Sequence, residues 1–223
     1  MLRPASIGLF AVLIVPRIAS AQFLDEQPRL VAGPMVGVSF ANLRGAGAVN
    51  TKASTGFVGG AFVTYLFTPY FGIQPEVFYV GKGASFEYDS AGTAAGTSTS
   101  TTYLEIPILF KARYPVTNGE WPLTFSVVAG PSFGLLVSCK VDYAAGASVD
   151  CDDVPPNSYY GDRSPAGLDF SGIFGIGFDF YHFAFQARYD LSITDSYSDV
   201  STLAPILKNV VWELTLGYKF AIH

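Results

Sequence analysis

The clearest pattern in the sequence is a strict alternation of apolar and polar side chains over residues 210–222, VVWELTLGYKFAI. Every second residue from Val210 to Phe220 is large and apolar, whereas the opposite face includes Glu213 and Lys219. A period of two is typical of a β-strand with one apolar and one polar face. Both faces are explained if the apolar face contacts lipid and the polar face lines the interior of a barrel.

Seven further segments alternate in the same way, so the chain is predicted to contain eight strands. Long connections follow the first, third, fifth and seventh strands, and near-minimal turns follow the second, fourth and sixth. Outer-membrane barrels show this asymmetry, with short periplasmic turns and long external loops. We therefore predict an all-β fold, an eight-stranded antiparallel up-and-down transmembrane β-barrel whose last strand pairs with its first. The predicted strands are residues 31–40, 56–67, 72–82, 102–114, 121–138, 167–180, 183–193 and 210–222.

Composition narrows the class of protein. Half of the residues are apolar and only 14% are charged, and the mean hydropathy is +0.34. Beyond the N-terminal segment, no stretch reaches the roughly 18 to 20 apolar residues that a membrane-spanning helix needs. The net charge of −5 and the absence of a Lys/Arg-rich run argue against nucleic-acid binding. A β-barrel in water or in a membrane remains.

The side-chain volumes favour the membrane. A soluble, lipocalin-like barrel would turn its large apolar residues inward, but eight strands enclose little more than their own side chains. The aromatic faces would overfill that space, so we place them outside. The charged side chains of the opposite faces would then form an interior network and satisfy one another as a plug. This network is predicted to contain Glu76, Glu105, Lys111, Arg113, Arg188, Asp190, Glu213 and Lys219.

The N-terminus indicates export. An apolar run at residues 5–15 precedes Ala19-Ser20-Ala21, an A-x-A cleavage pattern. We predict a signal peptide at residues 1–21, a short leader at 22–30 and the barrel at 31–222, located in a bacterial outer membrane. The alternative is an uncleaved N-terminal membrane anchor.

Few residues suggest other chemistry. Cys139 and Cys151 lie twelve residues apart in a long external loop and are predicted to form a disulfide, with two free thiols as the alternative. The acidic residues of that region are read as a solvated loop, although calcium binding is an alternative. The histidines beyond the signal peptide lie in a turn and at the C-terminus, so no Ser-His pair is available at the outer rim. We predict no enzyme activity, no cofactor and no metal site. The acidic residues concerned are Asp152, Asp153, Asp162 and Asp169.

The last strand also contains Thr215-x-Gly217-x-x-Phe220-x-Ile222. This pattern resembles the C-terminal signal by which the barrel assembly machinery recognises outer-membrane barrels. Ala221-Ile222-His223 follow Phe220, whereas the signal usually ends on an aromatic residue.

Five segments together resemble the PorT-like outer-membrane β-barrel family, often called porin family proteins. They are GIQPEVFYVGKGASFEY from Gly72, YLEIPILFKARYP from Tyr103, VVAGPSFGLL from Val127, FQARYDLSITD from Phe185 and KNVVWELTLGYKF from Lys208. The resemblance implies a small eight-stranded outer-membrane barrel. Most members have no established activity, and one branch is tied to protein secretion.

We expect a structural or interaction role, with the long loops presented outside. The expected partners are outer-membrane lipid, the barrel assembly machinery during insertion, and an extracellular or envelope protein bound through the loops. We expect a monomer. The alternatives are a narrow passive pore and a periplasmic lipid-binding barrel.

Overall fold

The computed structural model describes residues 29–45, 51–86, 97–117, 122–143, 146–153, 163–199 and 207–222. The predicted signal peptide and its cleavage site lie outside these residues. No helix within these ranges is long and apolar enough to cross a membrane.

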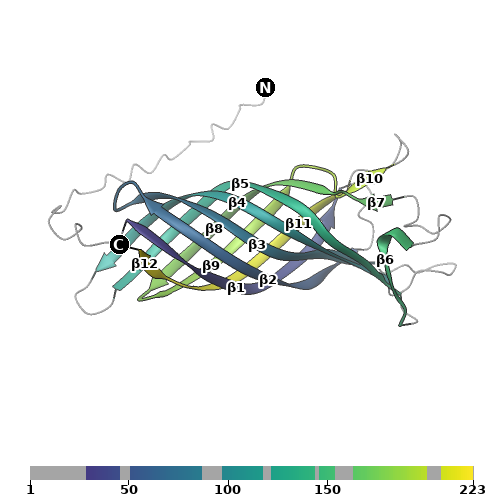
Figure 1. The fold of residues 1–223 in the computed structure, drawn as a ribbon, viewed down its shortest axis with the longest axis horizontal. Helices are drawn as coiled ribbons and strands as arrows, with labels where there is room; N and C mark the ends of the chain where they lie inside the picture. The colour runs from purple at the N-terminus through teal and green to yellow at the C-terminus, as the bar shows by residue number, and fades with distance from the viewer. Residues whose placement is uncertain are drawn as a thin grey trace, which may run out of the picture.

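Eight long strands in the described part of the chain close into an antiparallel barrel, which confirms the predicted fold (Figure 1). Each strand pairs with the next along the chain, and the last pairs with the first, so Val36 faces Leu216 and Phe40 faces Trp212. Closure removes the unpaired sheet edges that an open sheet would expose. The strands are β1 (Leu30–Arg44), β2 (Thr51–Leu66), β3 (Phe71–Phe86), β4 (Thr97–Thr117), β5 (Pro122–Asp142), β8 (Leu168–Phe180), β9 (Phe183–Ser192) and β11 (Lys208–Tyr218).

Short elements distinguish the two ends of the barrel. At one end, which we call the loop end, β6 (Ser148–Asp150) pairs with β5 and leads into the 3-10 helix η2 (Cys151–Asp153). There β7 (Arg163–Pro165) also pairs with β10 (Tyr197–Asp199). The other end, the turn end, carries the C-terminal strand β12 (Phe220–Ile222), which pairs with the start of β1 (Figure 1).

Several strands are longer at the loop end than the sequence predicted. β3 continues to Phe86 and β4 starts at Thr97, inside the segment 85–101 that was expected to be a loop. Similarly, β1 and β2 extend into 42–55, and β5 and β6 extend into 140–166. Ser, Thr, Gly and Ala in these extensions give no apolar alternation, but the backbone ladder continues through them.

The turn end also differs in detail from the expectation. The predicted last strand is interrupted at Lys219, between β11 and β12. Since β12 pairs with Leu30–Ala32, Leu30 belongs to the barrel and not to the leader. Tyr181 and His182 connect β8 to β9 in the space of two residues. Tyr181 adopts φ 50°, the left-handed conformation that so tight a reversal uses.

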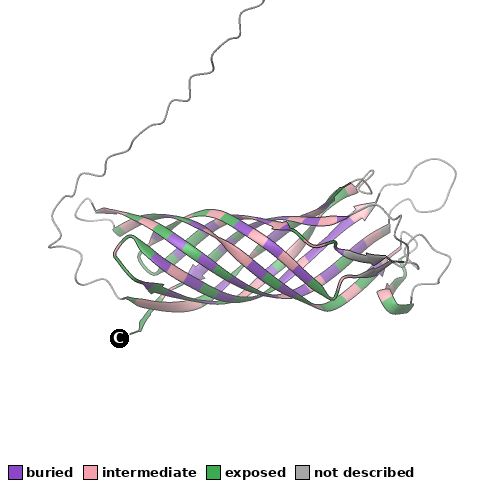
Figure 2. Ribbon diagram, turned by 90° about the horizontal axis from the view of Figure 1, so that it is seen from above, coloured by how far each residue is buried: buried purple, intermediate pink, exposed green. Residues whose placement is uncertain are grey.

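Side chains alternate between the two surfaces of the barrel wall along every long strand (Figure 2). The predicted outward residues are exposed, for example Phe57 at 63% and Trp212 at 55%. Aromatic side chains also collect on the outside of the turn end, as expected where a barrel crosses a membrane–water interface. This aromatic girdle contains Tyr65, Phe67, Tyr70, Phe71, Tyr114, Tyr181, Phe183, Tyr218 and Phe220.

Candidate functional site in the barrel interior

The barrel interior holds three clusters of polar side chains, stacked along the barrel axis. The loop-side cluster centres on Lys82, at the end of β3. Its ammonium group lies 2.6 Å from Oε1 of Glu105 and 2.9 Å from Oδ2 of both Asp169 and Asp190. The Tyr103 ring lies 5.5 Å from the same nitrogen. One cation therefore contacts carboxylates from β4, β8 and β9.

The middle cluster centres on Arg188 of β9, whose side chain is 1% exposed. Its Nη1 and Nη2 atoms donate to the two carboxylate oxygens of Glu76 at 2.6 Å each, the bidentate geometry that makes strong pairs. Its Nε atom donates to Gln186 at 2.9 Å. A Cβ atom on Gly175, the cross-strand neighbour, would lie 3.0 Å from Cγ of Arg188, so glycine leaves room for this side chain. Glu213 lies opposite Arg188 on β11.

Among the residues that the structure describes, the turn-side cluster has one carboxylate, Asp179 of β8. Its Oδ2 lies 3.1 Å from Nζ of Lys219 and 3.8 Å from Nζ of Lys111. Lys111 also donates to Oε1 of Gln74 at 3.1 Å. Because Gln74 donates in turn to Glu76 at 2.6 Å, hydrogen bonds link the turn-side and middle clusters.

All eight residues of the predicted charge network point into the barrel, where they divide among the three clusters, and Gln74 links the turn-side cluster to the middle one. Glu105 and Asp190 belong to the loop-side cluster, Glu76, Arg188 and Glu213 to the middle one. Lys111, Arg113 and Lys219 lie in the turn-side cluster. Arg113 makes no side-chain hydrogen bond or ion pair with any residue that the structure describes, and its Nε atom is buried.

Sequence reasoning missed three charged members of these clusters: Lys82, Asp169 and Asp179. Lys82 keeps the period of two that places Glu76 inward, but the glycines beside it resemble a loop. Asp169 was grouped with loop acids, whereas it is buried on β8 and accepts hydrogen bonds from Ser192 and Thr194. All three lie within the predicted strands 72–82 and 167–180, on the face opposite the apolar residues, so counting every charged residue of that face would have included them.

The interior also contains a group of acidic residues with metal-ligand spacing. One carboxylate oxygen from each of Glu105, Asp190 and Glu213 lies within 4.8 Å of the others. Lys82, however, already contacts Glu105 and Asp190 at 2.6 and 2.9 Å. The ammonium group thus supplies the positive charge that a metal ion would bring, and we assign no metal to these residues.

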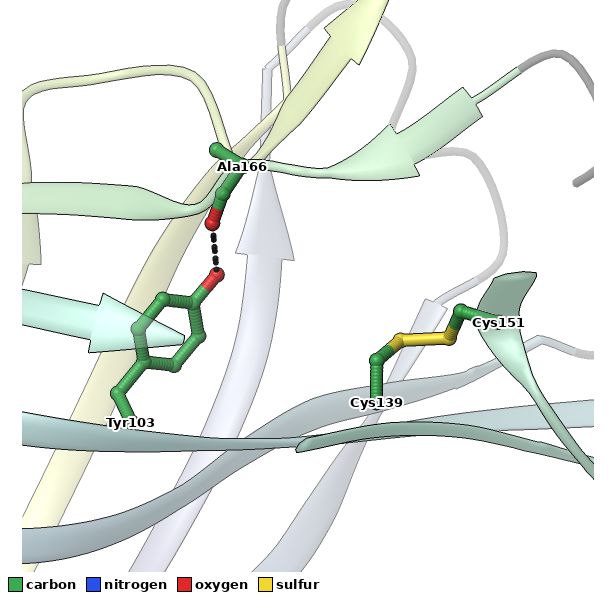
Figure 3. Close-up of a disulfide and its surroundings, with 4 residues drawn as sticks. All are labelled: Tyr103, Cys139, Cys151 and Ala166. Carbon is green, nitrogen blue, oxygen red and sulfur yellow. Dashed lines mark hydrogen bonds between the residues drawn. A yellow bond between two sulfur atoms is a disulfide. The ribbon is translucent and has the colours of Figure 1, made fainter. Parts of the chain in front are cut away.

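The loop end is tied together by covalent and apolar contacts. Cys139 and Cys151 form the disulfide, with their Cα atoms 5.5 Å apart, and it fastens η2 to β5 (Figure 3). Nearby, the Tyr103 hydroxyl donates to the carbonyl of Ala166 at 3.0 Å, which attaches the segment before β8 to the barrel wall (Figure 3). Buried apolar residues from separate parts of the chain also pack together here. This apolar cap consists of Leu43, Ala84, Val141 and Leu207, with Tyr143, Val149 and Cys151 against it.

A closed antiparallel barrel with an apolar exterior, an aromatic girdle and a charged interior is the architecture of an outer-membrane β-barrel protein. The family model described as the outer membrane protein beta-barrel domain matches residues 20–198. The chain belongs to this family. No curated protein matches it.

Solved structures of bacterial outer-membrane proteins are similar to this chain at low identity. Ail, the attachment invasion locus protein of Yersinia pestis, solved with the heparin analogue sucrose octasulfate, is 17% identical with a TM-score of 0.44. The match covers 86% of this chain and 99% of Ail. OprG of Pseudomonas aeruginosa is 13% identical over 86% of this chain and 96% of its own, also with a TM-score of 0.44.

Proposed function

We propose that this protein is a sealed outer-membrane barrel with a structural or interaction role, which presents its long connections outside the cell. The observation that supports this role is the filled interior. Lys82 and Arg188 each bind several interior side chains across the barrel, and the apolar cap lies beyond them at the loop end. Side chains held by several charged hydrogen bonds do not move aside to admit a solute without leaving buried charges unpaired.

The proposal includes export and assembly. The A-x-A pattern at residues 19–21 supports a cleaved signal peptide before the leader. Phe220 and Ile222 of the proposed assembly signal lie exposed on β12, and Thr215 and Gly217 face inward on β11. We infer a PorT-like member of the family from the five resembling segments. The proposed partners are outer-membrane lipid, the assembly machinery during insertion, and an extracellular or envelope protein.

A narrow passive pore is the second candidate function, because the turn end is hollow. A planar-bilayer recording of the purified mature protein separates the two functions. We expect no unit conductance from the wild-type protein. A stable unit conductance that Arg113→Ala abolishes would overturn the sealed-barrel proposal.

The interaction role needs a separate experiment. Envelope proteins are captured on the full-length barrel and on a variant in which residues 87–96 and 154–162 are replaced by short Gly-Ser linkers. A partner bound through the loops is lost from the shortened variant, whereas a partner bound through the barrel wall is retained. Retention of every captured protein would contradict recognition through these two connections. Heat-modified mobility on gels confirms that both proteins are folded.

A periplasmic lipid-binding barrel is a weaker alternative. Its apolar side chains would have to enclose the ligand, but they lie on the outer surface, and charged groups fill the inside. Lysis without detergent tests this alternative directly, because the mature protein should stay with the envelope membranes. Recovery in the soluble fraction would refute the membrane assignment.

A further inference from the structure

The turn end contains a cavity of about 190 Å³ that no part of the sealed-barrel role uses. It is lined by residues of β1, β2, β4, β8 and β12 and of the turn that connects β8 to β9. Val31, Leu66 and Ala221 supply the apolar lining, and the other described lining residues carry polar groups. They are Thr64, Lys111, Arg113, Asp179, Tyr181, His182 and Lys219.

The cavity has more positive than negative groups. Lys111, Arg113 and Lys219 line it, and Asp179 is the single carboxylate among the lining residues that the structure describes. Both lysines share the same oxygen of Asp179, at 3.8 and 3.1 Å. Arg113 has no ion pair or hydrogen bond from its side chain to the described residues, although its Nε atom is buried. Arg113 is half-buried, and a buried Nε–H group without an acceptor is costly, so an external acceptor would stabilise it.

Among the three interior clusters of described residues, this is the one in which cations outnumber carboxylates. The other two clusters contain five carboxylates and only two cations, Lys82 and Arg188. A bound anion would be repelled there, whereas at the turn end it would complete the neutralisation of three cations. The five carboxylates belong to Glu76, Glu105, Asp169, Asp190 and Glu213.

We propose that the turn-end cavity binds a phosphate group. The planar fork of Arg113 can donate two hydrogen bonds to one tetrahedral oxyanion, and Lys111 and Lys219 add point charges beside it. A cavity of about 190 Å³ accepts a compact anion, since sites for drug-sized ligands start at about 300 Å³. The phosphate can be inorganic phosphate or a phospholipid head group, because the aromatic girdle places this end of the barrel at the membrane interface.

Calorimetric titration with inorganic phosphate tests the proposal on the mature protein in a non-ionic, phosphate-free detergent. We expect saturable binding that Arg113→Gln weakens about tenfold or more, the loss expected for a charged hydrogen bond. Lys219→Gln is the second variant. Lys219 lies outside the long strands with its side chain 17% exposed, so the barrel should fold without its charge. Lys140→Gln, which removes an exposed cation at the loop end, is the matched control and should bind like wild type.

Native mass spectrometry from lipid nanodiscs identifies the source of the phosphate. Nanodiscs with phosphatidic acid supply an accessible head-group phosphate, and nanodiscs of phosphatidylcholine alone serve as the comparison. If inorganic phosphate binds in the calorimetric titration, and the protein retains no more lipid from phosphatidic acid nanodiscs than from phosphatidylcholine nanodiscs, the ligand is free phosphate. A retained phosphatidic acid that Arg113→Gln and Lys219→Gln both release would assign the lipid head group. If neither ligand binds, or if both variants bind like Lys140→Gln, the proposal is wrong.

Discussion

Replacing Lys82 by methionine removes the charge at the centre of the loop-side cluster and keeps most of the side-chain volume. Its ammonium group contacts three buried carboxylates at 2.6 to 2.9 Å, and the side chain itself has no exposed surface. Removing one partner of a buried ion pair costs about 3–5 kcal/mol, because the other charge stays buried without compensation. We expect Lys82→Met to reduce the free energy of unfolding by about this amount.

The loss of the Lys82 charge should destabilise the three carboxylates to different extents. Asp169 keeps hydrogen bonds from Ser192 and Thr194 at 2.9 and 3.1 Å. Asp190 loses the single side-chain donor that contacts it in the described structure. Adding Asp190→Asn to Lys82→Met should therefore recover more stability than adding Asp169→Asn.

The assay is equilibrium unfolding in urea from lipid vesicles. Trp212 lies on the outer wall, so its fluorescence changes when the strand leaves the lipid. Lys140→Met is the control for the substitution itself and should change stability by no more than about 0.5 kcal/mol. If Lys82→Met costs no more than Lys140→Met, or if the two double variants are equally stable, this account of the cluster is incorrect.

Three further variants test other parts of the structure. Ile176→Lys places a charge on the lipid face of β8 and should cost about 2–4 kcal/mol in the same urea assay, unless that face meets water. Cys139→Ser opens a twelve-residue loop worth up to about 3 kcal/mol. Amide exchange should rise at Val141 and the urea midpoint should fall, and an unchanged midpoint would show that the disulfide adds no stability. Tyr103→Phe removes the hydrogen bond to Ala166 and should cost about 1 kcal/mol, and unchanged stability would show that the bond contributes nothing.

The strands that cross the membrane were predictable because each of their faces meets a different environment. Along β11, the outward Trp212 and Leu214 alternate with the buried Glu213, so the sequence itself alternates between apolar and polar residues. Beyond the membrane the outward face meets water instead of lipid, so it need not be apolar and the contrast disappears. The ends of β3 and β4 were therefore mistaken for loop, although their backbones pair as far as Phe86 and Thr97.

The partners inside the barrel were less predictable than the direction of each side chain. Lys82 and Asp190 are 108 residues apart in the sequence, on β3 and β9, which are not neighbours in the sheet. Their side chains come into contact across the barrel interior. Alternation states only that a side chain points inward. Its height along the axis depends on the register of every intervening strand, including the bulges in β2 and β5. The sequence could thus predict an interior charge set but not its division into three clusters.

The loop end and the turn end of the barrel interior contain different kinds of side chain. This difference allows a barrel that is sealed along its axis to bind phosphate at one end. At the loop end, the apolar cap and the Cys139–Cys151 disulfide lie beyond the Lys82 cluster. At the turn end, Arg113 and two lysines surround a cavity. Lys111 of this cavity is linked through Gln74 to Glu76 of the Arg188–Glu76 pair, so the filled middle of the barrel follows directly on the cavity. Arg113→Gln should therefore weaken phosphate binding without creating or removing any conductance. In a pore, the same substitution would change both properties together.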